Sequence, residues 1–357
     1  RGRKGILGIA GRIAMIHRRH FLQSTVLLAG WGGLEAAKPQ QASGTESDRQ
    51  DSPSVSQAQS QVQSKDASLT PAGPTRFQIA CMTLPYARFP LVRALKGIQA
   101  AGFKYVAWGT THREDSGQNI PVLARDDPPA KAKELAGRCR DLGLEPVMMF
   151  SMVYPEAPDG LEVLTQRIKQ AGAAGIGQVL TFGHTKGGNR QLWVERFKAL
   201  APIAKDHNVI LVIKQHGGET GTGQACAAIT QEVNHPHIKV NYDAGNVLDY
   251  LEKDPIADVR TCVSEIRSFC IKDHRLWPKK EDCGPGFGEI DHYRLLQPVA
   301  FTGLTMPLAC ENIFAPLLPR PEKAEDVDKL ARHAREFLEW VVQGLQSAPS
   351  VSKPMGK

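Results

Sequence analysis

The sequence lacks the short motifs by which several classes of protein are recognised. No Gly-x-Gly-x-x-Gly turn follows the first apolar run after residue 76, and no phosphate-binding loop is present, so nothing local supports nucleotide binding. The seven cysteines include no Cys-x-x-Cys pair and no zinc-ribbon spacing. Cys81, Cys270 and Cys310 lie in apolar runs, and we interpret the cysteines as buried, reduced thiols.

The chain also lacks a broad excess of positive charge outside its first residues. The formal net charge is +7, but residues 1–20 hold six basic residues and no acidic one. Residues 21–75 hold three basic and five acidic residues, which leaves a net charge of only +3 for everything that follows. A surplus this small and this localised argues against a face that binds nucleic acid.

No apolar run near the N-terminus is long enough to form a stable membrane anchor, since residues 21–34 are few and glycine-rich. The arginine pair 18–19 is followed by one variable residue and then by Phe-Leu, a pattern that resembles a twin-arginine export signal. We therefore expect residues 1–37 to direct export to the periplasm, with Met15 as a natural start. A basic disordered tail is the alternative.

The composition after this signal divides the chain into three parts. Residues 38–75 are rich in Ser, Gln, Ala, Asp and Pro and contain almost no large apolar residue, which predicts a disordered linker. Residues 348–357 are predicted to form a disordered tail. The part between them, residues 76–347, is long enough for one barrel-sized domain.

From residue 77 the sequence alternates short apolar runs with amphipathic stretches. The apolar runs are continuous, which is typical of parallel strands buried on both faces. The amphipathic stretches begin near Pro or end at Gly in several places, as helices do. The expected strands are 77–83, 105–109, 146–152, 178–183, 209–215, 238–243, 268–272 and 306–311, and the expected helices are 90–101, 129–142, 161–174, 192–207, 222–233, 292–300 and 324–345. This pattern predicts a (β/α)8 TIM barrel, with a doubly wound sheet as the alternative.

In a TIM barrel the reactive side chains gather at the carboxyl ends of the strands. Polar or aromatic residues recur at or just beyond these positions: Trp108, His112, His184, Lys214, His216, Asp243, Lys272, Asp273, His274 and Glu311. A single such residue is more often a helix cap or a turn residue. A set of them is harder to explain that way, because buried ionic groups cost free energy unless they are paired, metal-bound or in use.

Five segments, in order and spacing, resemble the xylose isomerase-like TIM barrel superfamily, which contains sugar phosphate isomerases and epimerases. They are VILVIKQHGG (209–218), IKVNYDAGNVLDY (238–250), SFCIKDHR (268–275), GPGFGEID (284–291) and PLACENIF (307–314). The resemblance implies the barrel fold, a sugar or polyol substrate, and proton abstraction next to a carbonyl. Because members of the family often pair, a homo-oligomer is also an expectation.

The resemblance further implies one divalent metal, held by Glu, Asp, His and Glu at the ends of strands five to eight. Asp243 and Glu311 match two of these positions, but Lys214 replaces the strand-five Glu and Cys270 replaces the strand-seven His. An ammonium close to a divalent cation is repelled by it. Two of the four ligand positions are therefore altered in a way that puts the metal in doubt.

Three arrangements are compatible with a lysine at position 214. In the first, Lys214 points away, and Mn, Mg, Co or Zn is held by the two retained carboxylates with His216 or His274. In the second, Lys214 replaces the metal, pairs with both carboxylates and stabilises an enediolate oxygen. In the third, Lys214 forms a Schiff base with a carbonyl substrate.

The leading hypothesis is an exported isomerase or epimerase of a sugar or keto-sugar, or a related lyase or hydrolase. Glu311 is the expected general base, and Lys214 or a metal is the expected electrophile. Side chains expected to bind the substrate are Trp108, His112, His184, His216, Lys272 and Asp273. A non-catalytic carbohydrate-binding barrel with a degenerate metal site is the alternative. An abasic-site endonuclease with this fold needs a His-rich zinc cluster, and the strand ends hold too few histidines for one.

Overall fold

The structure is a computed structural model that describes residues 73–347. The expected export signal, most of the expected linker and the expected C-terminal tail lie outside the described residues. The first strand of the described part begins at Arg76 and its last helix ends at Gln346.

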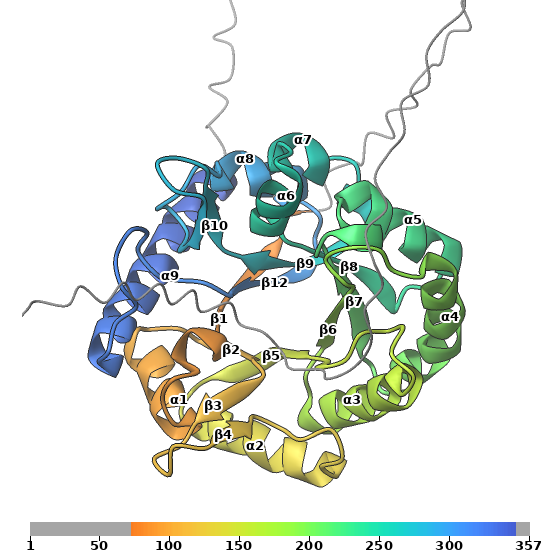
Figure 1. The fold of residues 1–357 in the computed structure, drawn as a ribbon, viewed down its shortest axis with the longest axis horizontal. Coiled ribbons are helices and arrows are strands. Elements are labelled where there is room, and N and C mark those ends of the chain that lie inside the picture. Colours follow the sequence, from red (N-terminus) through yellow and green to blue (C-terminus); the bar gives the residue numbers. More distant parts are fainter. Residues whose placement is uncertain (1–72, 348–357) are drawn as a thin grey trace, which may run out of the picture. The chain divides into compact units, whose positions relative to one another are not determined.

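The strands close into a parallel barrel in the order β1-β12-β9-β8-β7-β6-β5-β2 (Figure 1). They are β1 (Arg76–Met82), β2 (Tyr105–Trp108), β5 (Glu145–Phe150), β6 (Gln178–Phe182), β7 (Ile210–Lys214), β8 (Ile238–Tyr242), β9 (Ile266–Ile271) and β12 (Thr305–Cys310). Because β1 pairs with both β2 and β12, the sheet has no free edge, which excludes the doubly wound alternative. The predicted (β/α)8 barrel is thus confirmed.

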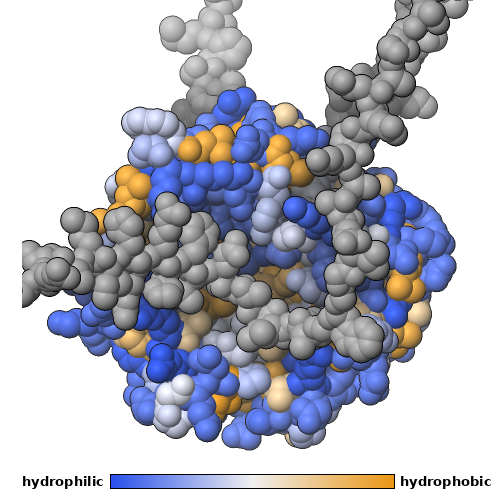
Figure 2. Space-filling view, in the orientation of Figure 1, coloured by the Kyte–Doolittle hydropathy of each residue, from blue (hydrophilic) through white to orange (hydrophobic). Residues whose placement is uncertain are grey.

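Helices surround the barrel on its outside (Figure 1). They are α1 (Leu91–Ala100), α2 (Pro129–Asp141), α3 (Gly160–Ala174), α4 (Arg190–Asp206), α5 (Gly223–Val233), α6 (Ala244–Leu251), α7 (Pro255–Val259), α8 (His292–Leu296) and α9 (Ala324–Gln346). Figure 2 shows that their visible outer surface is largely hydrophilic, with small apolar patches. Among residues 73–347, no helix is long and apolar enough to cross a membrane.

The buried apolar side chains form two clusters, one on each face of the closed sheet. The larger lies between the strands and the helices and includes Leu211 and Ile213 of β7. The smaller fills the barrel interior and includes Val212, Cys270 and Ala309. Since successive side chains of a strand point to opposite faces, both faces of each strand are apolar, as the continuous runs predicted.

The loops contain short elements that the sequence did not predict. Two antiparallel hairpins follow barrel strands: β3 (Thr111–Arg113) with β4 (Asn119–Pro121) after β2, and β10 (Asp273–Arg275) with β11 (Glu281–Cys283) after β9. The helices α6 and α7 occupy the segment between β8 and β9. The β10–β11 hairpin and α6 both lie beside the end of the barrel where the polar residues gather.

Candidate active site

The alternation of side chains along the strands brings four charged residues into the mouth of the barrel. Lys214 follows the interior residue Val212 by two positions, and Glu311 follows Ala309 in the same way. Lys272 stands in the same relation to Cys270, and Asp243 comes directly after β8. All four therefore meet at the carboxyl ends of neighbouring strands, where a TIM barrel performs its chemistry.

Lys214 lies at the centre of this group. Its Nζ donates a hydrogen bond to Glu311 Oε1 at 2.7 Å and lies 3.3 Å from Asp243 Oδ2. Cys270 Sγ is 3.8 Å from the same nitrogen. The rings of Phe150 and Phe182 flank the ammonium, with centroids 5.7 and 5.4 Å from Nζ. The ammonium is thus enclosed by two carboxylates, a thiol and two aromatic faces.

Lys272 forms a second ammonium contact with the same carboxylates. Its Nζ donates to Glu311 Oε2 at 3.0 Å and to Asn246 Oδ1 at 2.6 Å, and it lies 3.4 Å from Asp243 Oδ2. Asp282 Oδ2, on the β10–β11 hairpin, is 3.5 Å away. Each oxygen of Glu311 therefore faces one lysine, and the two ammonium charges are balanced by nearby carboxylates.

The local structure fixes Asp243 in place. Its Oδ1 accepts a hydrogen bond from the backbone nitrogen of Asn246 at 2.9 Å, so Asp243 is the N-cap of α6. Its own backbone nitrogen donates to Gln215 Oε1 at 2.7 Å. Its Oδ2 is buried and has no geometrically good hydrogen bond within the described structure, although two ammonium groups lie within 3.4 Å.

Burial and neighbouring charges shift the pKa values of these groups in a consistent direction. Burial alone would lower the pKa of Lys214, but the carboxylates of Glu311 and Asp243 raise it above its ordinary value. Burial raises the pKa of Glu311, yet Lys214 and Lys272 lower it well below its usual range. Lys214 is therefore an ammonium and Glu311 a carboxylate over the whole neutral range.

Asp243 and Cys270 respond mainly to burial. Burial raises the pKa of Asp243, against the lowering effect of the two lysines. Burial likewise raises the pKa of the Cys270 thiol well above its ordinary value, and Glu311 adds to the effect. Cys270 is consequently a protonated thiol, which is a poor nucleophile.

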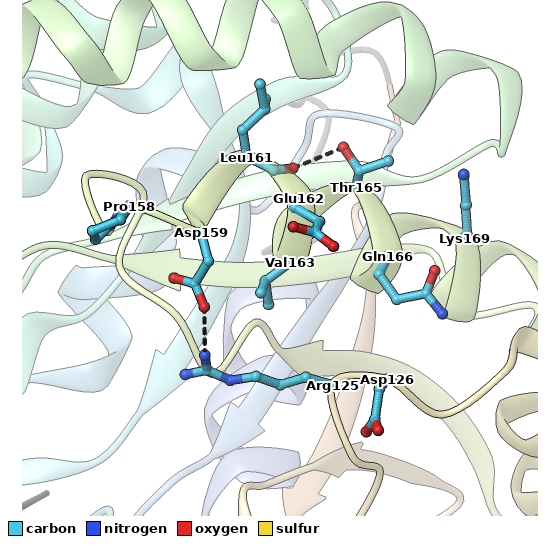
Figure 3. A pocket seen from close by; sticks show the side chains of 10 residues that line it. All are labelled: Arg125, Asp126, Pro158, Asp159, Leu161, Glu162, Val163, Thr165, Gln166 and Lys169. Carbon is cyan, nitrogen blue, oxygen red and sulfur yellow. Dashed lines mark hydrogen bonds and ion pairs between the residues drawn. The ribbon is translucent and has the colours of Figure 1, made fainter.

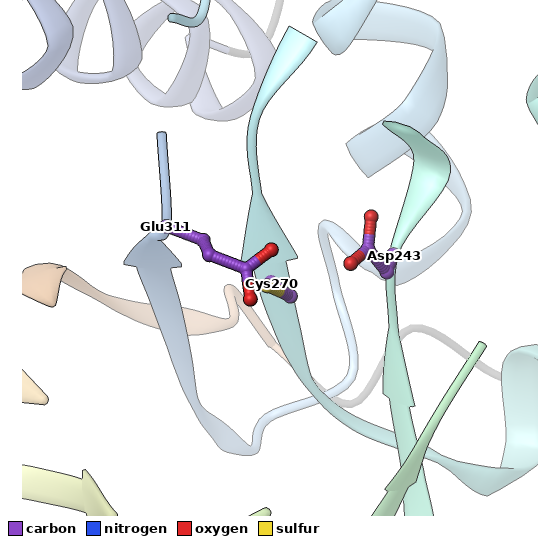
Figure 4. Close-up of side chains that lie close together, drawn as sticks. All are labelled: Asp243, Cys270 and Glu311. Carbon is purple, nitrogen blue, oxygen red and sulfur yellow. The ribbon is translucent and has the colours of Figure 1, made fainter. Parts of the chain in front are cut away.

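Asp243, Cys270 and Glu311 form a group of possible metal ligands, since one donor atom of each lies within 4.8 Å of the others (Figure 4). The Lys214 ammonium, however, lies within 3.8 Å of a donor atom of all three. Two unit charges of the same sign repel by about 4 kcal/mol at 4 Å and moderate dielectric, and a divalent cation would meet Lys272 as well. These residues fit an ammonium better than a divalent metal.

The two imidazoles considered as replacement ligands lie outside this group of three. His216 Nδ1 is 2.7 Å from the carbonyl oxygen of Gly183 and donates to it. Burial and Lys214 lower the pKa of His216 to about 4, so its ring is neutral. His274 Nδ1 lies 2.8 Å from Asp282 Oδ1, and its ring is 1% exposed. His274 thus positions Asp282 beside Lys272.

Three residues assigned to the substrate are almost completely buried. Trp108 and His112 are each 1% exposed, and His112 Nδ1 donates to the carbonyl oxygen of Phe89 at 2.9 Å. Asp273 is also 1% exposed, and its oxygens accept four backbone N–H groups, those of His274, Gly286, Gly288 and Ile290. Burial leaves these three side chains no free face for a sugar.

A second polar group lies at the mouth, on the loops after β5 and β6. His184, which the sequence assigned to the substrate, has 47% of its side chain exposed and lies against Tyr154, with ring centroids 4.0 Å apart and ring planes tilted by 38°. Its Nε2 lies 3.7 Å from Glu156 Oε1. Glu156 was missed by the sequence reasoning. Its position in the loop after a barrel strand was the one signal that could have found it.

A surface hollow of about 810 Å³ lies elsewhere, at the start of α3 (Figure 3). Its lining includes Arg125 and Asp159, which form an ion pair of 2.9 Å, and Lys169. None of the charged residues of the barrel mouth lines it. Size alone therefore does not mark the functional site, and the convergence of buried charges is the better guide.

Comparison with known proteins identifies a family and a fold. The family model described as xylose isomerase-like TIM barrel matches residues 95–339. No curated protein matches the chain in sequence. A solved structure of an L-ribulose 3-epimerase is 18% identical, with a TM-score of 0.59 over 78% of this chain and 99% of that one.

Two further solved structures have the same fold. A xylose isomerase-like TIM barrel protein from Mycobacterium smegmatis, in complex with magnesium, is 16% identical, with a TM-score of 0.58 over 77% of this chain and 98% of that one. A fusion of a xylose isomerase-like TIM barrel with 4-hydroxyphenylpyruvate dioxygenase is 20% identical, with a TM-score of 0.58 over 76% of this chain. The match spans 43% of that fusion protein. At these identities the likeness shows the fold alone.

Proposed function

The chain belongs to the xylose isomerase-like TIM barrel family, and we propose that it is a sugar isomerase or epimerase in which the Lys214 ammonium replaces the divalent metal. One observation carries the proposal: Lys214 Nζ lies 2.7 Å from Glu311 and 3.3 Å from Asp243, among the three possible metal ligands. The fold that the chain shares with an L-ribulose 3-epimerase supports the reaction class.

In the proposed reaction the two lysines stabilise the oxygen on which negative charge develops. A substrate carbonyl oxygen accepts hydrogen bonds from Lys214 and Lys272, and these donors become stronger partners as the oxygen gains the charge of an enediolate. Neither ammonium must move far or change protonation, because both are already held in the mouth by Glu311 and Asp243. The site is therefore organised before the substrate arrives.

Glu311 acts as the general base of this proposal, and substrate binding activates it. In the free protein both of its oxygens accept hydrogen bonds from lysines, which keep its pKa low and its basicity weak. Once Lys214 donates to the substrate oxygen, Glu311 loses one of these donors and its pKa rises. It then removes a proton from the carbon beside the carbonyl. Delivery of this proton to the former carbonyl carbon, while the neighbouring hydroxyl proton passes to the former carbonyl oxygen, gives the isomer. Delivery of a solvent proton to the opposite face of the deprotonated carbon gives the epimer.

The paired charges favour a neutral sugar over a phosphorylated one, because no ammonium of the central group is left without a carboxylate.

We also propose that the protein is exported, and only the twin-arginine-like segment supports this proposal. A signal that acts in the cell will place the protein in the periplasmic fraction, and mutation of both arginines will retain it in the cytoplasm.

Deuterium exchange tests the proposed reaction. The chelator-treated protein, incubated with L-ribulose or D-fructose in D2O, is expected to place deuterium at the carbon beside the carbonyl, detected by NMR. Glu311→Gln and Lys214→Met are each expected to slow the exchange at least about a hundredfold, as removal of a catalytic base or oxyanion donor does.

Lys239→Met is the matched control. Lys239 forms a similar, largely buried ion pair with Glu265 at 2.8 Å, but it is not part of the central group at the mouth. Exchange that Lys214→Met leaves unchanged would contradict the proposal. A protein that binds these sugars without exchanging any proton would instead be the non-catalytic carbohydrate-binding barrel.

A further inference from the structure

We propose that Glu156 and His184 form a recognition site for the hydroxyl groups at the end of the sugar remote from Lys214, and that they exclude sugars with an anionic group there. This inference deepens the proposed function and rests on it for the placement of the reacting end at Lys214. It names the substrate class as an uncharged sugar whose far end carries free hydroxyl groups.

A continuous series of aromatic rings joins this pair to the central lysine. The Phe182 ring lies 5.4 Å from Lys214 Nζ, and the Tyr154 ring lies 5.8 Å from that of Phe182. The His184 ring contacts the Tyr154 ring, with centroids 4.0 Å apart. The apolar face of a sugar packs well on such a surface. A sugar with its carbonyl at Lys214 can therefore lie along these rings with its other end at His184 and Glu156.

The carboxylate of Glu156 is held in position before any ligand binds. Its Oε2 accepts a hydrogen bond of 2.6 Å from Trp193 Nε1 on α4. Arg196, also on α4, donates to the carbonyl oxygens of Pro155 and Ala157, the residues on either side of Glu156. The loop that carries Glu156 is thus fixed at both neighbours and at the side chain.

The other oxygen of Glu156 lacks a partner. Oε1 is buried and accepts no hydrogen bond from any residue that the structure describes, and His184 Nε2 is too far away, at 3.7 Å, to donate one. A buried carboxylate oxygen without a donor costs free energy. This oxygen can accept a hydrogen bond from a ligand, and a sugar hydroxyl has the proton to supply.

An anionic group fits this place poorly. A phosphate or a carboxylate has no proton to donate at neutral pH, and it would bring negative charge against the charge of Glu156. A hydroxyl can donate to Glu156 and accept from the half-exposed ring of His184 at the same time. The pair therefore distinguishes a sugar end that carries hydroxyl groups from one that carries an anionic group.

The test compares neutral ketoses with their terminal phosphates. D-fructose and D-fructose 6-phosphate, and L-ribulose and L-ribulose 5-phosphate, are assayed by deuterium exchange and by calorimetric binding. The wild type is expected to prefer the neutral sugar. Glu156→Gln is expected to raise the KM for the neutral sugar about tenfold or more with little change in kcat, because a charged hydrogen-bond acceptor is lost. The same variant is expected to reduce the preference for the neutral sugar over its phosphate.

Two further variants sharpen the result. Trp193→Phe removes the donor that holds Glu156 and is expected to raise KM by a smaller factor. Glu162→Gln, an exposed acid of α3, is the control and is expected to leave KM unchanged. Equal use of the phosphorylated and neutral sugars by the wild type, or a KM for Glu156→Gln equal to that of the control, would overturn the inference.

Binding separates the failure of this inference from that of the proposed reaction. If no sugar exchanges deuterium, but the neutral sugars bind and Glu156→Gln weakens that binding, the recognition site stands and the isomerase proposal falls. If neither neutral sugar binds, the recognition site falls as well.

Discussion

Lys214 is the residue on which the proposed reaction depends. Taking two ammonium groups and two carboxylates out of water is expensive, and buried ion pairs often add little to stability. A well-packed apolar core would hold the end of the barrel at least as well. The retention of four charges at the carboxyl ends of strands therefore points to chemistry at this site rather than to the stability of the fold.

Restoring the ligand set that the family resemblance implies is expected to restore metal binding. The double variant Lys214→Glu with Cys270→His removes the central ammonium and adds a carboxylate and an imidazole beside Asp243 and Glu311. It is expected to bind a divalent cation such as Mn²⁺ or Zn²⁺ stoichiometrically, measured by calorimetry and metal analysis. Cys270→His alone, with Lys214 retained, is the control and should bind none.

His216 is expected to make stability depend on pH in a narrow window. Burial and Lys214 lower its pKa to about 4 from an ordinary value of 6.5, so the unfolded chain takes up a proton between these values and the folded protein does not. The unfolding equilibrium should therefore shift toward the unfolded state as pH falls from 6.5 to 4, by up to about tenfold per pH unit. Chemical denaturation at several pH values measures this.

Other buried histidines contribute to the same slope, since burial also lowers the pKa of His112 and His292. The difference between the wild type and His216→Gln isolates the share of His216. The exposed His333, replaced by Gln, provides the control. A slope that His216→Gln leaves unchanged would show that this ring is not buried in its neutral form.

At this scale the sequence predicted the unusual residues better than their partners. Lys214 and Cys270 stood out because they replace ligands of a known pattern, and the structure brings both to the predicted place. Glu156 could not be found in this way, since its role depends on the distance to His184 across two loops. His112 and Asp273 were assigned to the substrate, but side-chain burial, which sequence does not report, gives them structural partners.

Among the elements, the loop after the β10–β11 hairpin depends on one carboxylate. Asp273 accepts backbone N–H groups from His274, Gly286, Gly288 and Ile290. The backbone of Gly288 passes so close that an added Cβ would lie 2.3 Å from Asp273 Oδ1. The glycines of the Gly-x-Gly run thus allow the backbone to pass close to the Asp273 carboxylate.

Asp273→Asn is expected to destabilise the barrel by about 2–5 kcal/mol, because an amide nitrogen would face two backbone donors and leave them unpaired. Urea denaturation measures the change. Asp291→Asn is the matched control, since Asp291 accepts a single N–H, that of Arg294, as the N-cap of α8. Asp291→Asn should lower the free energy of unfolding by about 1 kcal/mol or less. Equal losses in the two variants would refute the role given to Asp273.

The barrel strands and most of the surrounding helices were predictable, and the small elements in the loops were not. The strand predicted at 238–243 is β8 (Ile238–Tyr242), and the helix predicted at 161–174 is α3 (Gly160–Ala174). Each belongs to the regular alternation of apolar runs and amphipathic stretches along the chain. The helix α7 and the hairpin strands have five residues or fewer. Their conformation is set by packing on the barrel and not by local sequence.

For the whole molecule, the closed sheet explains how distant segments form one site. Asp243, Lys272 and Glu311 lie at the ends of β8, β9 and β12, which are neighbours in the barrel. Closure also removes sheet edges and supplies an apolar interior on which the charged group rests. The fold could be predicted from the alternation of segments, whereas the depth and pairing of the charges required the structure.

The barrel is expected to fold without any metal. A ligand that binds only the folded state raises its stability, and its removal lowers the unfolding temperature. Because Lys214 already balances the carboxylates, EDTA is expected to leave the unfolding temperature unchanged in a calorimetric or circular-dichroism scan. A clear drop with EDTA, reversed by Mn²⁺ or Zn²⁺, would mean that a metal belongs to the native structure.

Metal content tests most directly whether the Lys214 ammonium stands where a metal would be held. The purified protein is incubated with Mn²⁺ and with Zn²⁺, freed of unbound metal and analysed by mass spectrometry, with Asp243→Asn in parallel. The wild type is expected to hold no stoichiometric metal and to catalyse deuterium exchange in the same sample. Stoichiometric metal that is lost in Asp243→Asn would contradict this expectation.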